Sequence, residues 1–215
     1  MSQDSILEAI RAQGVIPVLR NASAEDAVAT AEACGRAGMK VVELTCSTPE
    51  VERAIAALAA QGFRVGLGTV LSAEQVEGAA AAGAEFVVSF AAPAAALQGA
   101  RENGLLAIPG AFTPSEFLAC VEGGAELVKL FPARAAGPAY LRDLRSVMPT
   151  LQIVATGGIA IGDGSIATWL EAGAVAVGLG SSLGTASAIG VDQVTDRAAA
   201  ALAEARAKER GNEER

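Results

Sequence analysis

Short apolar runs alternate with alanine-rich stretches along the whole chain. The starts of these runs recur roughly every 20–25 residues, the length of one strand–helix unit. Most runs are apolar at every position, as is typical of strands that are covered on both faces. The pattern predicts eight strands, over residues 15–20, 41–45, 65–70, 86–90, 105–109, 127–131, 153–156 and 174–179.

The stretches between these runs carry the signals of helix starts and ends. Ser23 and Ser72 each stand just before acidic or amide residues, as N-cap residues do. Thr113 is followed by Pro114, and proline is favoured at the first helical position. Several stretches end in Ala-Gly, as at Gly38, which is typical of a left-handed residue just beyond a helix.

Eight strand–helix units in one chain predict an α/β fold, a (β/α)8 TIM barrel in a single domain over residues 1–215. The alternative is an open doubly wound sheet, but no dinucleotide fingerprint follows the first strand, and the even spacing favours a closed barrel. An extra N-terminal helix is predicted over 4–13, and a terminal helix over 191–215 with a solvated end after Ala203.

Composition narrows the functional classes. The net charge of −8 comes with no long basic cluster, which argues against nucleic acid or an anionic membrane as a partner. No apolar run reaches the ~18 residues of a membrane span, and no signal peptide is visible, so a cytoplasmic location is expected. The three cysteines lack metal-like spacing and are expected to be reduced thiols. The absence of histidine excludes a Ser-His-Asp triad and histidine-ligated zinc.

Lys129 lies inside the apolar run 127–131, where its ammonium must reach water or be desolvated. Desolvation favours a neutral amine, which is a nucleophile and can form a Schiff base with a carbonyl substrate. The alternative is a lysine that extends to the surface or pairs with a carboxylate. Glu43 is a similar carboxylate within the run 41–44. Inside one barrel the two could form a structural ion pair, or Glu43 could act as a proton shuttle.

Polar and turn-forming residues gather at the predicted C-terminal ends of the strands, where barrel enzymes place their sites. Two glycine segments, Gly157-Gly158 and Gly180-Ser181, follow the seventh and eighth strands. Barrels frequently bind phosphate there through backbone N–H groups, although the glycines could serve tight turns alone. The other candidates at strand ends are Arg20, Thr45, Ser47, Thr69, Ser89, Pro109 and Thr156.

Taken together, these segments resemble the 2-keto-3-deoxy-6-phosphogluconate (KDPG) aldolase family, which includes 2-keto-3-deoxy-6-phosphogalactonate and 4-hydroxy-2-oxoglutarate aldolases. The resemblance covers about residues 12–185. It implies a class I pyruvate aldolase, a lyase that acts as a homotrimer without a metal or other cofactor. The segments that carry it include Val42-Glu43-Leu44-Thr45, Gly66-Leu67-Gly68-Thr69-Val70, Lys129-Leu130-Phe131-Pro132-Ala133, Thr156-Gly157-Gly158-Ile159 and Gly178-Leu179-Gly180-Ser181.

The resemblance also implies roles for single residues. Lys129 would form the Schiff base with the C2 carbonyl of a 2-keto acid, and Glu43 would move protons during dehydration and C–C cleavage. The products would be pyruvate and glyceraldehyde 3-phosphate, with cleavage of 4-hydroxy-2-oxoglutarate as a related activity. Arg20 and Thr69 would face the pyruvate carboxylate; Gly157, Gly158 and Ser181 would hold the phosphate, with Thr156 near the substrate chain; Ser47, Ser89, Pro109, Phe131 and Gly180 are further candidates for substrate binding.

The chain departs from the family pattern at three places. Ser47 stands where many members carry arginine, Phe90-Ala91 follows Ser89, and the loop 160–164 looks longer than usual. Two other classes therefore stay open, a non-catalytic phosphate-binding barrel and another barrel enzyme such as an isomerase or synthase. The first would leave an idle buried pair of Lys129 and Glu43, and the second would need no amine nucleophile in the sixth strand.

Overall fold

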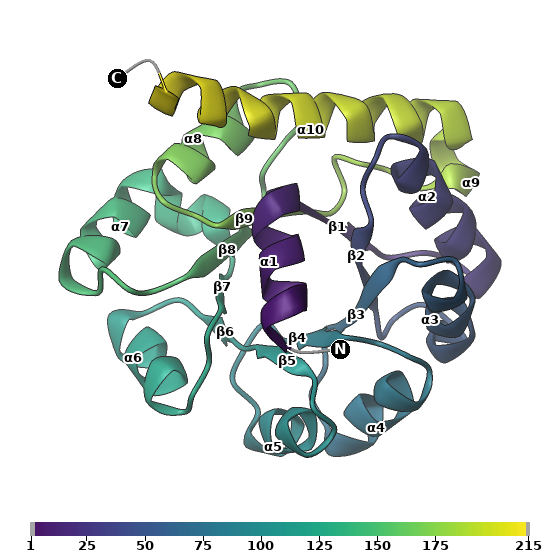
Figure 1. The fold of residues 1–215 in the computed structure, drawn as a ribbon, viewed down its shortest axis with the longest axis horizontal. Coiled ribbons are helices and arrows are strands. Elements are labelled where there is room, and N and C mark those ends of the chain that lie inside the picture. The colour runs from purple at the N-terminus through teal and green to yellow at the C-terminus, as the bar shows by residue number, and fades with distance from the viewer. Residues whose placement is uncertain (1–2, 214–215) are drawn as a thin grey trace.

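The computed structural model describes residues 3–213, with side chains through residue 207. Parallel strands form a central barrel, and helices surround it (Figure 1). The strands are β1 Val15–Leu19, β2 Val41–Thr45, β3 Arg64–Gly68, β4 Phe86–Val88, β5 Leu106–Ile108, β6 Gly110–Ala111, β7 Val128–Leu130, β8 Ile153–Thr156 and β9 Ala176–Leu179. The helices are α1 Gln3–Gln13, α2 Ala24–Arg36, α3 Val51–Ala60, α4 Ala73–Ala81, α5 Ala94–Glu102, α6 Pro114–Glu122, α7 Ala133–Val147, α8 Ser165–Glu171, α9 Ala186–Ile189 and α10 Val191–Glu213.

The barrel closes around Pro109. The strand order is β5-β4-β3-β2-β1-β9-β8-β7-β6, and β5 and β6 are consecutive segments on either side of this proline. β5 pairs with β4, while β6 pairs with β7. The Pro109 carbonyl accepts a hydrogen bond from the Lys129 N–H at 2.8 Å, which adds to the β6–β7 contact. The fold is thus the expected barrel rather than an open sheet, and its fifth strand is divided in two.

Side chains on each strand alternate between two apolar layers, as the pleat requires. Leu127 belongs to the cluster inside the barrel, whereas Val128 and Leu130 belong to the layer between barrel and helices. On β2, Val41 lies inside, and Val42 packs outside. Lys129 and Glu43 share the parity of the inner residues, so the strands aim both ionisable side chains into the barrel.

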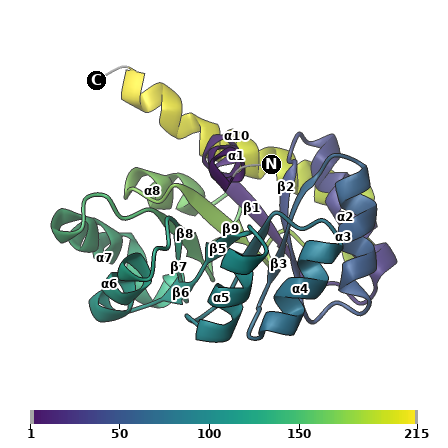
Figure 2. The same ribbon diagram turned by 60° about the horizontal axis from the view of Figure 1, so that its bottom comes forward.

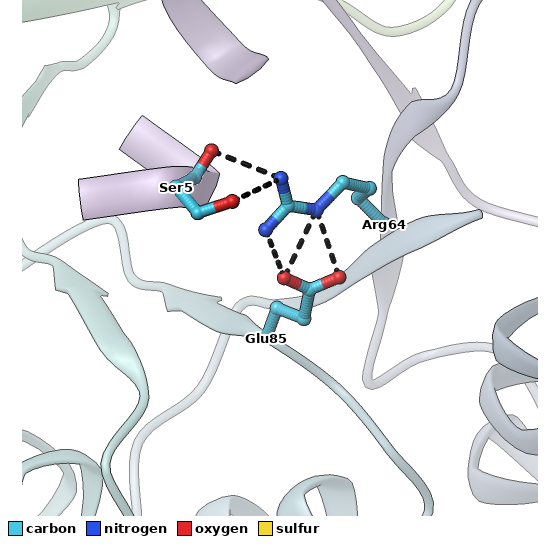
Figure 3. Close-up of polar contacts among 3 residues, drawn as sticks. All are labelled: Ser5, Arg64 and Glu85. Carbon is cyan, nitrogen blue, oxygen red and sulfur yellow. Dashed lines mark hydrogen bonds and ion pairs between the residues drawn. The ribbon is translucent and has the colours of Figure 1, made fainter. Parts of the chain in front are cut away.

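Helix α1 covers one end of the barrel (Figures 1 and 2). Its Ile6 and Ile10 belong to the apolar cluster inside the barrel. Arg64, at the start of β3, forms an ion pair with Glu85 and donates from Nη1 to the Ser5 carbonyl at 2.9 Å (Figure 3). Because α1 closes this end, a substrate must enter at the opposite end, where the strands terminate.

The local signals read from the sequence are confirmed. Ser23 caps α2, and Ser72 and Thr113 form capping boxes at α4 and α6. Gly38 has a φ of +102°, in the left-handed region expected beyond a helix. The extra N-terminal helix is present as α1, while residues 214–215 of the predicted terminal helix lie outside the described residues. Between residues 3 and 213, no helix combines the length and apolar character needed to cross a membrane.

Candidate active site

Lys129 and Glu43 meet inside the barrel, although they come from β7 and β2. Lys129 Nζ lies 3.6 Å from Glu43 Oε1, and their side chains are only 7% and 4% exposed. Within the described residues, Glu43 Oε1 accepts no hydrogen bond. Buried carboxylate oxygens are normally satisfied, so an oxygen that accepts no hydrogen bond beside a buried amine marks a candidate functional site.

Both side chains open into a cavity of about 270 Å³ at the C-terminal ends of the strands. The cavity has the size of a small-molecule site. It brings together most of the side chains and glycines that the sequence singled out, includes Phe90, one of the departures from the family pattern, and adds Val18 and Ile159. The predicted residues that line it are Arg20, Glu43, Thr69, Lys129, Phe131, Thr156, Gly157, Gly158, Gly180 and Ser181.

Three predicted binding residues do not line this cavity. The Ser47 hydroxyl lies 2.9 Å from Thr45 Oγ1, and Thr45 in turn donates to the Leu19 carbonyl. Ser89 is buried, and its hydroxyl accepts from the Ala91 N–H at 3.3 Å. Pro109 supports the backbone of Lys129 through its carbonyl. In the free protein these three residues stabilise the strand ends, and a direct contact with substrate stays a prediction for each.

Thr69 has an unusual backbone conformation at the end of β3. Its φ is +65°, in the left-handed region that a β-branched residue rarely adopts. Such strain persists where the surrounding structure fixes a residue, and it clusters at functional sites. The conformation keeps Thr69 on the cavity wall, in the position predicted for a carboxylate-binding residue.

Thr156, at the end of β8, supplies a second free polar atom. The residue is 7% exposed, and its Oγ1 has no hydrogen-bond partner among the described residues. It lies against Gly178 on β9, where a Cβ would come within 2.4 Å of the Thr156 hydroxyl oxygen. Gly178 therefore makes room for this hydroxyl, which is buried and has no hydrogen-bond partner in the described residues.

The glycine segments after β8 and β9 form one side of the cavity. Gly157 and Gly158 have φ values of +104° and +80°. The backbone N–H groups of Gly158, Gly180 and Ser181 donate to no acceptor within residues 3–213. Free N–H groups in glycine-rich turns are suited to binding an anion.

Arg134 is a cation near this side that the sequence did not identify. Its side chain packs over Gly158, where a Cβ would come within 2.5 Å of Arg134 Cβ. Its backbone N–H donates to the Gly157 carbonyl at 2.9 Å. No ion pair to Arg134 or Arg20 occurs in the described part of the chain. The only sequence signal for Arg134 was its place five residues after Lys129, which by itself indicates nothing.

A larger hollow of about 420 Å³ lies between α2 and α3, away from the strand ends. Half of its lining residues are alanine, and the Arg53–Glu25 ion pair in its lining is exposed to solvent. It lacks a buried nucleophile or base. No group of three or more potential metal ligands occurs among the described residues. The strand-end cavity is therefore the candidate active site.

The fold and this cavity define a (β/α)8-barrel enzyme built around a buried lysine and a buried glutamate. Residues 6–199 match the family of KDPG and KHG aldolases, where KHG is 4-hydroxy-2-oxoglutarate, and the chain belongs to that family. Aldolases are lyases, so the chain is a lyase rather than a non-catalytic barrel, an isomerase or a synthase.

Individual relatives support the same assignment. The chain is 34% identical to the 2-dehydro-3-deoxy-6-phosphogalactonate aldolase of Escherichia coli over 173 residues, which cover 79% of this chain and 83% of the relative. It is 37% identical to the 2-dehydro-3-deoxy-phosphogluconate aldolase of Treponema pallidum over 158 residues, 72% and 75% of the two chains. The KDPG aldolase of Legionella pneumophila, solved with pyruvate captured as a covalent carbinolamine, superimposes with a TM-score of 0.82 at 29% identity, covering 90% of this chain and 96% of that one.

Proposed function

We propose that this protein is a class I aldolase that cleaves a 2-keto-3-deoxy-6-phospho sugar acid to pyruvate and glyceraldehyde 3-phosphate. The observation that carries the proposal is the Lys129 amine 3.6 Å from a Glu43 carboxylate oxygen that accepts no hydrogen bond, inside a cavity large enough for a six-carbon acid. Support also comes from the Legionella relative, which holds pyruvate as a carbinolamine.

Lys129 passes a proton to Glu43, and its neutral amine attacks the C2 carbonyl of the substrate to form a carbinolamine. Glu43 delivers a proton to the C2 hydroxyl, which leaves as water, and the protonated imine remains. Glu43 then accepts the proton of the C4 hydroxyl as the C3–C4 bond breaks. The bonding electrons move into the imine, which acts as the electron sink. The products are the aldehyde and the enamine of pyruvate, and protonation at C3 followed by hydrolysis releases pyruvate and regenerates Lys129.

The two ends of the substrate are assigned to different strand ends around the cavity. Arg20 and Thr69 face the pyruvate carboxylate, since they lie at the ends of β1 and β3 beside Glu43. The free N–H groups of Gly158, Gly180 and Ser181 suit the distal phosphate, with Gly157 setting the turn. The free Thr156 hydroxyl then lies along the substrate between the two ends.

The proposed enzyme is a cytoplasmic homotrimer that needs no metal or other cofactor. The three cysteines are free thiols in the fold, as expected in a reducing compartment. Large apolar side chains are exposed at Phe112, Leu118 and Val121, which suits a surface that contacts another copy of the chain. Light scattering on the purified protein tests the trimer.

The decisive experiment is borohydride reduction in the presence of pyruvate, followed by intact-protein mass spectrometry and peptide mapping. Wild-type protein should gain one reduced pyruvate adduct on Lys129, and Lys129→Met should gain none. A folded wild-type protein without an adduct would reject the Schiff-base mechanism.

The aldehyde partner is then found by assaying pyruvate release from phosphorylated and non-phosphorylated substrates. Faster turnover of 4-hydroxy-2-oxoglutarate, or of a non-phosphorylated sugar acid, would replace the proposed substrate while leaving the lysine chemistry intact.

A further inference from the structure

Helix α10 runs along the outside of the barrel and passes the loops that follow β8 and β9 (Figure 1). It packs against α2, α8 and α9. The sequence predicted a solvated end after Ala203, but Glu204 on this helix makes two hydrogen bonds to the rest of the fold. Two charged residues of α10, Arg197 and Glu204, contact the two loops whose glycines line the active site.

Arg197 contacts the loop after β9. Its Nη1 donates to the Ser182 carbonyl at 3.2 Å and lies 3.5 Å from the Leu183 carbonyl. These carbonyls directly follow Gly180 and Ser181, which line the cavity. The Ser182 hydroxyl donates to the Ile159 carbonyl at 3.2 Å, so the loop after β9 is also tied to the loop after β8.

Glu204 contacts the loop after β8. One carboxylate oxygen accepts the Gly162 N–H at 3.1 Å, and the other accepts the Ile166 N–H at 3.0 Å. Ile166 lies in the first turn of α8, so the carboxylate satisfies N–H groups that a helix start leaves free. The start of α8 is therefore occupied by a side chain of the protein, and an anion in the cavity must use the glycine N–H groups instead.

We infer that α10 is a clamp that positions the two anion-binding loops, with Arg197 and Glu204 as positioning residues that act without touching substrate. This inference rests on the proposed phosphate-binding role of Gly158, Gly180 and Ser181. Three N–H groups on two loops can bind one phosphate only if the loops hold a fixed relative position. Without the clamp, the binding energy of the phosphate would have to order the loops, and affinity for the phosphate would fall.

The experiment compares Glu204→Ala, Glu204→Gln and Arg197→Lys with wild type. Asp196→Asn is the matched control, because Asp196 is an exposed acid on the same helix and makes no hydrogen bond among the described residues. Each variant is assayed with the 6-phosphorylated substrate and with the same sugar acid lacking the phosphate. Inorganic phosphate is titrated as a competitive inhibitor, and the borohydride-trapped pyruvate adduct is quantified.

For Glu204→Ala, the KM for the phosphorylated substrate and the inhibition constant of phosphate should rise roughly tenfold, the effect of losing hydrogen bonds to a charged group. The KM for the non-phosphorylated substrate and the yield of pyruvate adduct should stay within about twofold of wild type. For Glu204→Gln and Arg197→Lys, both constants should lie between those of wild type and Glu204→Ala. Asp196→Asn should match wild type.

Two results would overturn the clamp. The first is an equal loss with both substrates, which would indicate a general structural role, and the second is unchanged phosphate inhibition in folded Glu204→Ala. If Glu204→Ala does not fold, the Glu204→Gln and Arg197→Lys data decide in the same way. Failure of the proposed function is a separate result, namely no pyruvate adduct in wild type. In that case direct titration of phosphate into wild type and Glu204→Gln still tests the clamp.

Discussion

The carboxylate of Glu43 lies against the backbone of Gly68, where a Cβ would come within 2.0 Å of Glu43 Oε1. The two residues are on neighbouring strands, β2 and β3, whose ladder pairs Glu43 with Gly66. The carboxylate can point at Lys129 from this position only because residue 68 lacks a side chain. The glycine on β3 therefore places the proposed proton shuttle.

Replacing Gly68 with alanine should displace Glu43 and slow turnover. We expect kcat to fall about 100-fold, because a misplacement of one ångström in a catalytic group can have that effect. Overpacking should lower the free energy of unfolding by about 1–3 kcal/mol, so the protein should still fold. Steady-state kinetics and thermal denaturation measure the two effects.

Gly78→Ala is the matched control for Gly68→Ala. Gly78 lies in α4, and the nearest atom to an added Cβ is 3.4 Å away, at ordinary contact distance. This variant should keep wild-type kinetics. Wild-type kcat in folded Gly68→Ala would show that the carboxylate position does not matter for turnover.

Removing Lys129 alone should destabilise the fold more than removing the charges of Lys129 and Glu43 together. Lys129→Met leaves the buried Glu43 without its partner, and breaking a buried pair costs about 3–5 kcal/mol. The double variant Lys129→Met with Glu43→Gln removes both charges, so we expect it to recover most of that loss. Neither protein should form a pyruvate adduct. Urea denaturation gives the free energies of unfolding.

Lys40→Met provides the control for removing a lysine. The Lys40 ammonium is exposed and lies 4.3 Å from the centre of the Phe63 ring, an interaction worth about 0.5–1 kcal/mol at an exposed site. A double variant as unstable as Lys129→Met would show that the pair does not stabilise the fold through its charges.

The Thr69 hydroxyl should contribute to pyruvate binding, while the strained backbone of Thr69 lowers the stability of the fold. Thr69→Gly relieves the strain of a left-handed residue, which is about 1–2 kcal/mol. This gain offsets the conformational entropy that a glycine loses on folding, about 0.5–1 kcal/mol. We therefore expect unfolding free energy at or above that of wild type. Loss of the hydroxyl should nevertheless raise the KM for pyruvate in the addition direction.

Thr69→Val separates the two effects, because valine keeps the β-branched shape and the strain but lacks the hydroxyl. It should show the same rise in KM with no gain in stability. An unchanged KM in both variants would remove Thr69 from the substrate site, and a strong destabilisation by glycine would show that the hydroxyl stabilises the fold.

Local patterns predicted the elements of this fold well, because each depends on residues close in sequence. The N-caps at Ser23, Ser72 and Thr113 are examples. The division of the fifth strand at Pro109 was not predicted. It arises where the barrel closes, with β4 pairing to one half and β7 to the other, and that pairing joins distant segments.

The same distinction explains the site. Lys129 and Glu43 stood out because charge within an apolar strand is unusual by itself. Phe90 stood out only as a departure from the family pattern. Arg134 and Glu204 did not stand out, because their importance depends on what lies opposite them in space. The left-handed φ of Thr69 had no local signal either, since threonine is not a residue that indicates this conformation.

Cys46 should be an unreactive thiol at neutral pH. Burial, with a smaller contribution from the carboxylates of Glu52 and Glu43, raises the pKa of Cys46 to about 11. The thiolate is the reactive form, so the thiol should be almost fully protonated at pH 7.5. We expect iodoacetamide to label it roughly 100-fold more slowly than an unperturbed cysteine with a pKa near 8.5. The rate should increase with pH until about 11.

Peptide mapping after timed alkylation of the folded protein measures the labelling of Cys46. In Glu52→Gln one nearby negative charge is lost, so the pKa of the thiol should fall and labelling at pH 8.5 should be faster. Rapid labelling of wild type at pH 7.5, with the fold intact, would contradict the raised pKa.

Phe90 should limit which aldehydes the enzyme accepts. The residue lines the cavity and is 46% exposed. Its backbone is fixed independently of the ring, because the Gly110 N–H donates to the Ala91 carbonyl at 2.8 Å and Gly110 packs against the Phe90 backbone. Phe90→Ala should therefore enlarge the cavity without moving the loop. We expect the ratio of kcat/KM for a longer aldehyde to that for glyceraldehyde 3-phosphate, in the addition direction, to rise about tenfold.

Val147→Ala is the control, because Val147, at the end of α7, is an exposed apolar side chain, at 75%, that does not line the cavity. It should leave the ratio unchanged. The pyruvate adduct should form normally in both variants, since neither substitution removes Lys129 or Glu43. If Phe90→Ala leaves the ratio as it is in wild type, the phenyl ring does not select the aldehyde, and selection must come from the glycine loops after β8 and β9.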